Sequence, residues 1–79
     1  MIRLQDARSE AECLAIFGET VRQIRLSRGL TADQVAAQGG WEFSHADVNA
    51  IEAGTYDVTV ETIYALAEAL GVSPKVLVS

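Results

Sequence analysis

The 79-residue sequence predicts a single, compact, all-α domain of five short helices. Three observations predict this fold class. Apolar residues recur at steps of three and four, serine or threonine caps precede these segments and glycines follow them, and β-branched residues occur singly rather than in alternating runs. Apolar residues make up 49% of the chain, which is enough for one core, and the length leaves no room for a second. We expect an arm over residues 1–8 and the helical domain over residues 9–79.

The first helix is expected to begin after Ser9, because Ser9 and Glu12 have the spacing of a capping box. The helical pattern continues to Arg28, and Gly29 supplies the stop. One face of this helix is predicted to pack in the core, through Leu14, Phe17, Val21 and Ile24.

The second helix is expected to begin at Thr31, with Gln34 as its capping partner, and to end at Gly39-Gly40. The turn that follows, residues 39–43, contains Trp41 and Phe43. These aromatic side chains either cover the core or present an apolar patch to a partner.

Ser44 is expected to cap the third helix, with Asp47 near its positive end and Gly54 as its stop. Thr59 caps the fourth helix, and Gly71 closes it. The inward positions predicted for the second, third and fourth helices are Val35, Ala36, Val48, Ile51, Val60, Ile63, Leu66, Ala67 and Leu70.

Ser73-Pro74 is a cap followed by proline at the first helical position, so a fifth helical turn should follow. It carries Val76, Leu77 and Val78. A domain this small buries a modest fraction of its surface, so self-association is expected to add stability. This turn and the arm around Ile2 are the first candidates for a homodimer surface.

The charge balance is acidic, with a net charge of −5 and a pI near 4.6. An acidic protein repels polyanions at long range. No Arg or Lys occurs between Arg28 and Lys75, whereas that stretch contains Asp33, Glu42, Asp47, Glu52, Asp57, Glu61 and Glu68.

The chain offers little catalytic chemistry. Its one cysteine, Cys13, has no disulfide partner and no metal-ligand neighbours, and is interpreted as a partly buried thiol rather than a reactive one. Cys13 and Ile16 fall off the main stripe of the first helix, as a minor apolar strip that a partner could cover. No phosphate loop is present, so we expect no enzyme activity, cofactor or metal. No signal peptide or membrane span is recognisable, which predicts a cytoplasmic protein.

The order of these elements resembles the Cro/Xre-type helix-turn-helix family. The resemblance covers roughly residues 17–78, and each mark alone is weak, but the ordered set is specific. The marks are Phe17-Gly18, Val21, Ile24-Arg25, Gly29-Leu30-Thr31, Val35-Ala36, Ser44 through Val48, Ile51-Glu52-Ala53-Gly54, Thr62-Ile63 and Leu66 through Ser73.

The resemblance implies a helix-turn-helix formed by the second and third helices, with the third entering the major groove of double-stranded DNA. Serine and histidine suit phosphates or base edges, and asparagine suits adenine. The implied DNA-binding residues are Thr31, Ser44, His45, Ala46, Asn49, Arg28, Arg22 and Tyr56. For Tyr56, phosphate contact and turn packing are both open. For His45, a neutral hydrogen-bonding side chain and a pH switch are both open.

The family also implies a structural clamp between Arg25 and Glu52, with Gly54 as a left-handed helix cap. A solvated Arg25 is the alternative. Three features depart from the family. Ala32 stands in the place near the start of the second helix where DNA-binding members carry glutamine. The third helix and the turn after it lack cations, and the turn between the two helices is longer.

Two functions from different classes remain. The first is a sequence-specific DNA-binding transcriptional regulator that acts as a homodimer, with weak salt dependence because few cations are available. The second is an acidic helix-turn-helix module that binds a protein partner, such as a regulator, a toxin or a polymerase subunit, in place of DNA.

Overall fold

The computed structural model describes residues 10–38 and 44–78. Over these residues the chain forms five helices and no strand: α1 (Glu10–Ser27), α2 (Ala32–Gln38), α3 (His45–Ala53), α4 (Val60–Leu70) and α5 (Pro74–Val78). The all-α prediction is therefore confirmed for the described part of the chain. The expected arm and the expected cap Ser9 lie outside it, as does the turn that contains Trp41 and Phe43.

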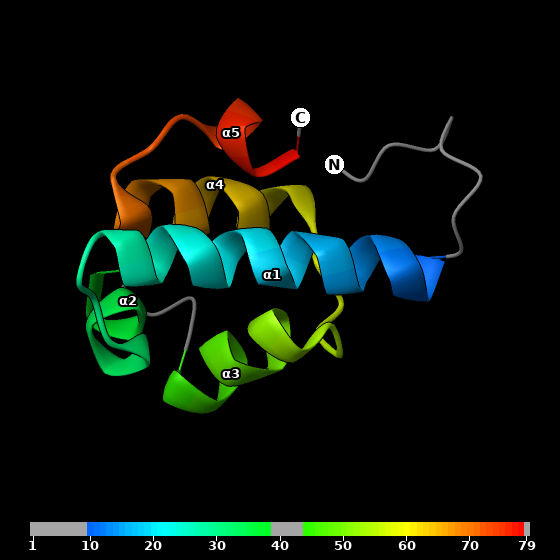
Figure 1. Cartoon of the computed structure of the whole chain (residues 1–79), viewed down its shortest axis with the longest axis horizontal. Helices are drawn as coiled ribbons and strands as arrows, with labels where there is room; N and C mark the ends of the chain where they lie inside the picture. The colour runs from blue at the N-terminus through cyan, green and yellow to red at the C-terminus, as the bar shows by residue number, and fades with distance from the viewer. Residues whose placement is uncertain (1–9, 39–43, 79) are drawn as a thin grey trace.

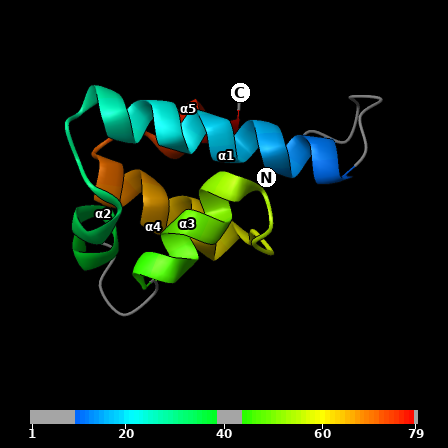
Figure 2. The ribbon, with the colours of Figure 1, turned by 60° about the horizontal axis from the view of Figure 1, so that its bottom comes forward.

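The long helix α1 crosses the molecule in Figure 1, with α3 on one side of it and α5 on the other. It packs against α3 and α5, while α4 packs against α2 and α5. The short helix α2 closes one end, where it packs against α3 as well. The two helices of the helix-turn-helix therefore lie next to each other, with α1 packed against α3 and α4 packed against α2 (Figure 2).

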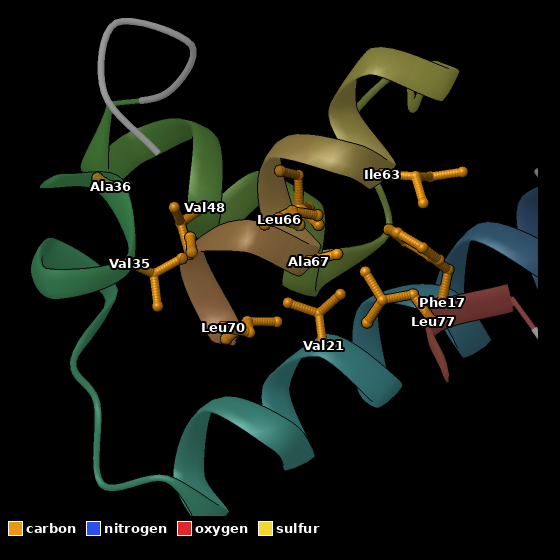
Figure 3. Packing of buried hydrophobic residues seen from close by; sticks show 12 residues of the cluster. Phe17, Val21, Val35, Ala36, Val48, Ile63, Leu66, Ala67, Leu70 and Leu77 are labelled. Carbon is orange, nitrogen blue, oxygen red and sulfur yellow. The ribbon is translucent and has the colours of Figure 1, made fainter. Parts of the chain in front are cut away.

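One buried cluster joins all five helices, and Figure 3 shows its members converging from them. The predicted inward residues of α2 and α3 are all buried, as are Phe17 and Val21 of α1. Ile24 is half-buried and packs against the cluster. In α5, Leu77 belongs to the core, while Val76 is exposed. Of the residues expected to form a dimer surface there, Leu77 is therefore unavailable.

Two predictions of side-chain placement are wrong. Cys13 is buried and Ile16 is 48% exposed, so they do not share a strip. Cys13 lies four residues before Phe17, which puts both on the core face. Val60 was expected to face inward, yet it is 47% exposed. It occupies the first position of α4, one turn before the buried Ile63.

The predicted caps explain where the helices start and stop. Thr31 and Gln34 form a reciprocal capping box at α2, with Thr31 N–H donating to Gln34 Oε1 (2.8 Å) and Gln34 N–H donating to Thr31 Oγ1 (3.1 Å). Gly71 ends α4 in the left-handed conformation, at φ 74°. The first helix ends at Ser27, one residue earlier than expected, and Arg28 and Gly29 form the turn after it.

Candidate nucleic-acid interface

The start of α3 is polar, capped and exposed. Ser44 precedes the helix in an extended conformation, its Oγ accepts from Asp47 N–H (3.2 Å), and its own N–H donates to Asp47 Oδ2 (3.1 Å). The Ser44 hydroxyl hydrogen is left to donate elsewhere. His45, Ala46 and Asn49 follow with exposed side chains. The structure thus brings four predicted contact residues together on one end of one helix.

A contact that the sequence did not indicate links this end to α2. His45 Nδ1 lies 2.7 Å from Asp33 Oδ1, a residue of the first turn of α2. Both side chains remain largely open to solvent, at 55% and 75% exposed. Asp47, the acidic residue expected near the positive end of this helix, is engaged in the cap of α3.

The other end of α3 is held closely by α1. A side chain at Gly18 would overlap the carbonyl oxygens of Ile51 and Glu52, the second of which would lie 2.7 Å from its Cβ. Gly54 ends α3 in the left-handed conformation at φ 79°, and a Cβ there would meet Ala15 Cα at 3.0 Å. The C-terminal end of α3 therefore rests directly on the backbone of α1, as Figure 2 shows.

Arg25 and Glu52 join the same two helices through a bidentate ion pair. Arg25 Nε donates to Glu52 Oε2 at 2.6 Å and Nη2 donates to Oε1 at 3.1 Å. Arg25 Nη1 also donates to the carbonyl of Leu30 (2.9 Å) in the turn before α2. The two side chains are only 15% and 9% exposed. The hydrogen bond to Glu52 raises the pKa of Arg25 above its ordinary value.

The two cations expected to face DNA, Arg22 and Arg28, lie on α1 and in the turn after it. Arg22 is exposed on α1, and its Nη1 lies 3.9 Å from Glu19 Oε2. The guanidinium of Arg28 lies beside Gly71, because a Cβ there would stand 3.5 Å from Arg28 Nη1. This turn leads from α4 to α5, well separated from the start of α3 in Figure 1.

Thr31 and Tyr56 flank the helix-turn-helix. Thr31 is exposed at the cap of α2, with its hydroxyl already accepting the Gln34 N–H. Tyr56 follows the C-terminal cap of α3 and is partly buried against the core cluster. Tyr56 therefore packs in the turn, as one of the two alternatives for this residue predicted.

Sequence reasoning missed Asp33 and the packing role of Gly18. Gly18 was noted only as part of the Phe17-Gly18 mark. Its place inside a helix was a usable signal, because a glycine there often indicates close approach of another backbone. No comparable signal exists for Asp33, an ordinary acidic residue in a first turn. Within residues 10–38 and 44–78, no group of three or more His, Cys, Asp or Glu side chains is placed to hold a metal ion. No helix there is long and apolar enough to cross a membrane.

Comparison with known proteins gives consistent results. A model of the helix-turn-helix family matches residues 21–77. The HTH-type transcriptional regulator y4dJ of Sinorhizobium fredii, itself uncharacterized, is 39% identical over 64 residues, which is 81% of this chain and 80% of that protein. The control protein C.BamHI of Bacillus amyloliquefaciens is 36% identical over 61 residues, 76% of this chain and 73% of its own length.

A solved structure agrees with these relatives. The restriction-modification controller protein C.AhdI of Aeromonas hydrophila superposes with a TM-score of 0.76 at 31% identity, over 81% of this chain and 94% of the other. The family model, which matches residues 21–77, spans α2, α3 and α4 in full and the end of α1. This chain belongs to the Cro/Xre-type helix-turn-helix family.

Proposed function

We propose that this protein is a sequence-specific DNA-binding transcriptional regulator that inserts the start of α3 into the major groove. The observation that carries the proposal is the contrast within α3. Its first turn exposes Ser44, His45, Ala46 and Asn49, while its last turn is fixed on α1. A reading helix must be rigidly supported at one end and open at the other, so that its side chains meet base edges in one register.

The exposed residues have complementary chemistry for a groove. The exposed Asn49 amide makes no side-chain hydrogen bond to the described residues, so it is available for the bidentate contact that suits adenine. The Ala46 methyl suits the thymine methyl group. Ser44 can donate its hydroxyl hydrogen to a phosphate oxygen beside the positive end of the helix.

Weak electrostatic attraction is part of the proposal. Arg25 is engaged by Glu52 and Arg28 lies at the α4–α5 turn, while Asp33 and Asp47 stand at the reading end. Each neutralised phosphate contributes about −0.9 to the slope of log K against log salt. We therefore expect a slope much shallower than the value of about −5 that six such contacts produce, and low affinity for nonspecific DNA.

We also propose a homodimer, because two copies of α3 can read half-sites about 34 Å apart. Exposed apolar side chains are available on three helices: Ile16 and Leu26 on α1, Val60 and Tyr64 on α4, and Val76 on α5. Sedimentation of the wild type and of Val76→Glu tests this. The wild type should sediment as a dimer and the variant as a monomer, and a monomeric wild type at micromolar concentration overturns it.

The protein-binding alternative is not favoured, since the relatives carry names of transcriptional regulators and control proteins. These relatives belong to a family of regulators rather than of enzymes. They are bacterial, and because DNA lies in the bacterial cytoplasm we propose that location here. No cofactor is part of the proposed activity.

The direct experiment is selection from a random double-stranded DNA library, followed by fluorescence anisotropy on the selected site at low and moderate salt. Wild-type protein should enrich one sequence. Asn49→Ala should weaken binding to it about tenfold or more. Gln23→Ala is the matched control, because it also replaces an exposed amide, one that bonds only to Glu19 of its own helix. Failure of the wild type to enrich any sequence at low salt overturns the function.

A further inference from the structure

The contact between Asp33 and His45 joins the first turn of α2 to the first residue of α3. We propose that Asp33 is a positioning residue that holds the His45 imidazole in a single tautomer and so determines which bases His45 accepts. This inference rests on the proposed DNA-binding function. It concerns specificity, because a polar contact this exposed adds little to folding stability.

The tautomer follows from hydrogen-bond chemistry. An ionised carboxylate only accepts hydrogen bonds, so the atom 2.7 Å from Asp33 Oδ1 must carry a hydrogen. That atom is Nδ1, and in a neutral imidazole the other nitrogen, Nε2, is then an acceptor. Neutral histidine in water favours the opposite tautomer, with the hydrogen on Nε2. Asp33 therefore reverses the ordinary preference of this side chain.

The geometry leaves Nε2 free for a ligand. No hydrogen bond of Nε2 is present among the described residues, and the His45 side chain is 55% exposed at the reading end of α3. Asp33 approaches from α2, so the ring is oriented from outside its own helix. A fixed ring has fewer rotamers to lose when DNA binds, which sharpens discrimination between bases.

An acceptor at Nε2 selects a particular class of base edge. In the major groove, cytosine N4 and adenine N6 are donors, whereas guanine N7 and O6 and thymine O4 are acceptors. The Nδ1–H tautomer therefore favours cytosine or adenine at the position that His45 contacts and opposes guanine and thymine. The Nε2–H tautomer would invert this preference. Asp33 sets the preference without touching DNA.

The first test is made on free protein and needs no DNA. His45 is the only histidine in the chain, so a long-range ¹H–¹⁵N NMR spectrum at about pH 8, well above the ordinary histidine pKa, reports its tautomer without ambiguity. We expect the Nδ1–H form in the wild type and in Asp33→Asn, whose amide oxygen still accepts. We expect the Nε2–H form in Asp33→Ala. An Nε2–H wild type overturns the proposal.

The second test repeats the DNA selection with the same variants. Asp33→Ala and His45→Ala should each lose about tenfold of discrimination at one base position per half-site. Asp33→Asn should keep the preference while binding all DNA more tightly, because a negative charge has gone. If Asp33→Ala and Asp33→Asn behave alike, Asp33 acts only through its charge and the inference is wrong.

The two levels of failure are distinguishable. If the wild type enriches a sequence and Asp33→Ala enriches the same one with equal discrimination, the inference fails and the function stands. If the wild type enriches nothing, the function fails and the specificity role falls with it. Thermal melts of all variants verify folding, and little change is expected because Asp33 is exposed.

Discussion

The two ends of α3 are built by different rules. The C-terminal end is closely packed on α1. Ile51 is buried, Gly54 lies against the backbone of Ala15, and Glu52 accepts two hydrogen bonds from Arg25. The N-terminal end is exposed and polar, and its polar contact with α2 is the solvent-exposed pair of His45 with Asp33. The helix is thus fixed to the rest of the domain at its C-terminal end, and the side chains at its N-terminal end stay free to contact a ligand. Changes at one end should affect folding, and changes at the other should affect binding.

The largest effect is expected from Gly18→Ala at the anchored end. A Cβ there overlaps backbone carbonyls, which no change of rotamer relieves. We expect a loss of about 3 kcal/mol in the free energy of unfolding, measured by urea titration. Gly29→Ala is the matched control: it has open space and only the strain of φ 69°, so it should lose about 1 kcal/mol. Equal losses in the two variants would contradict close packing of α1 on α3.

The next effect is expected from the ion pair that spans α1 and α3. Glu52→Gln should cost about 2 kcal/mol, because it leaves the largely buried Arg25 charge without its counter-ion. A double-mutant cycle with Arg25→Met should show a coupling of about 1 kcal/mol or more. Glu19→Gln makes the same change in the exposed pair with Arg22 and should cost less than about 0.5 kcal/mol.

This ion pair should not make stability depend on pH in the ordinary range. The raised pKa belongs to Arg25, so its contribution is complete below the ordinary arginine pKa and is lost only as the pH rises through the higher folded value, in strong alkali. A stability difference between wild type and Arg25→Met that changed between about pH 6 and 9 would contradict this assignment.

The smallest effect is expected from Asp47→Asn at the reading end. The amide oxygen can still accept the Ser44 N–H, so the free energy of unfolding should change by less than about 0.5 kcal/mol. Removing a negative charge close to phosphate should raise DNA affinity roughly threefold at low salt, an effect that salt then screens. Asp47→Ala, which also loses the cap, should lower stability by about 1 kcal/mol. Unchanged affinity in Asp47→Asn would place Asp47 away from the DNA.

Most of the fold was predictable because its signals are local. The capping boxes at Thr31 and Ser44 and the left-handed stop at Gly54 involve residues within a few positions of one another. The Arg25–Glu52 pair was expected only through the family resemblance, since 27 residues separate the two. Its presence follows from how α1 crosses α3, which local pattern does not contain.

The candidate interface was predictable in part. Ser44, His45, Ala46 and Asn49 share one exposed end, as their spacing along a single helix requires. Arg28 could not be placed in the same way, because it follows the last turn of α1 and its direction depends on the chain after the helix. The structure puts it beside Gly71. The placement of Val60 and Cys13 was mispredicted for a similar reason, because the burial of a side chain depends on how the neighbouring helices pack around it.

The sequence by itself determined the five helices, their caps, most of the core and the end of α3 that faces outward. These features depend on periodicity and on hydrogen bonds between residues three or four positions apart. Only the tertiary structure decided that Gly18 packs against the C-terminal end of α3 and that Asp33 contacts the His45 imidazole. Both contacts depend on the crossing and rotation of separate helices, which are set by the packing of the whole core.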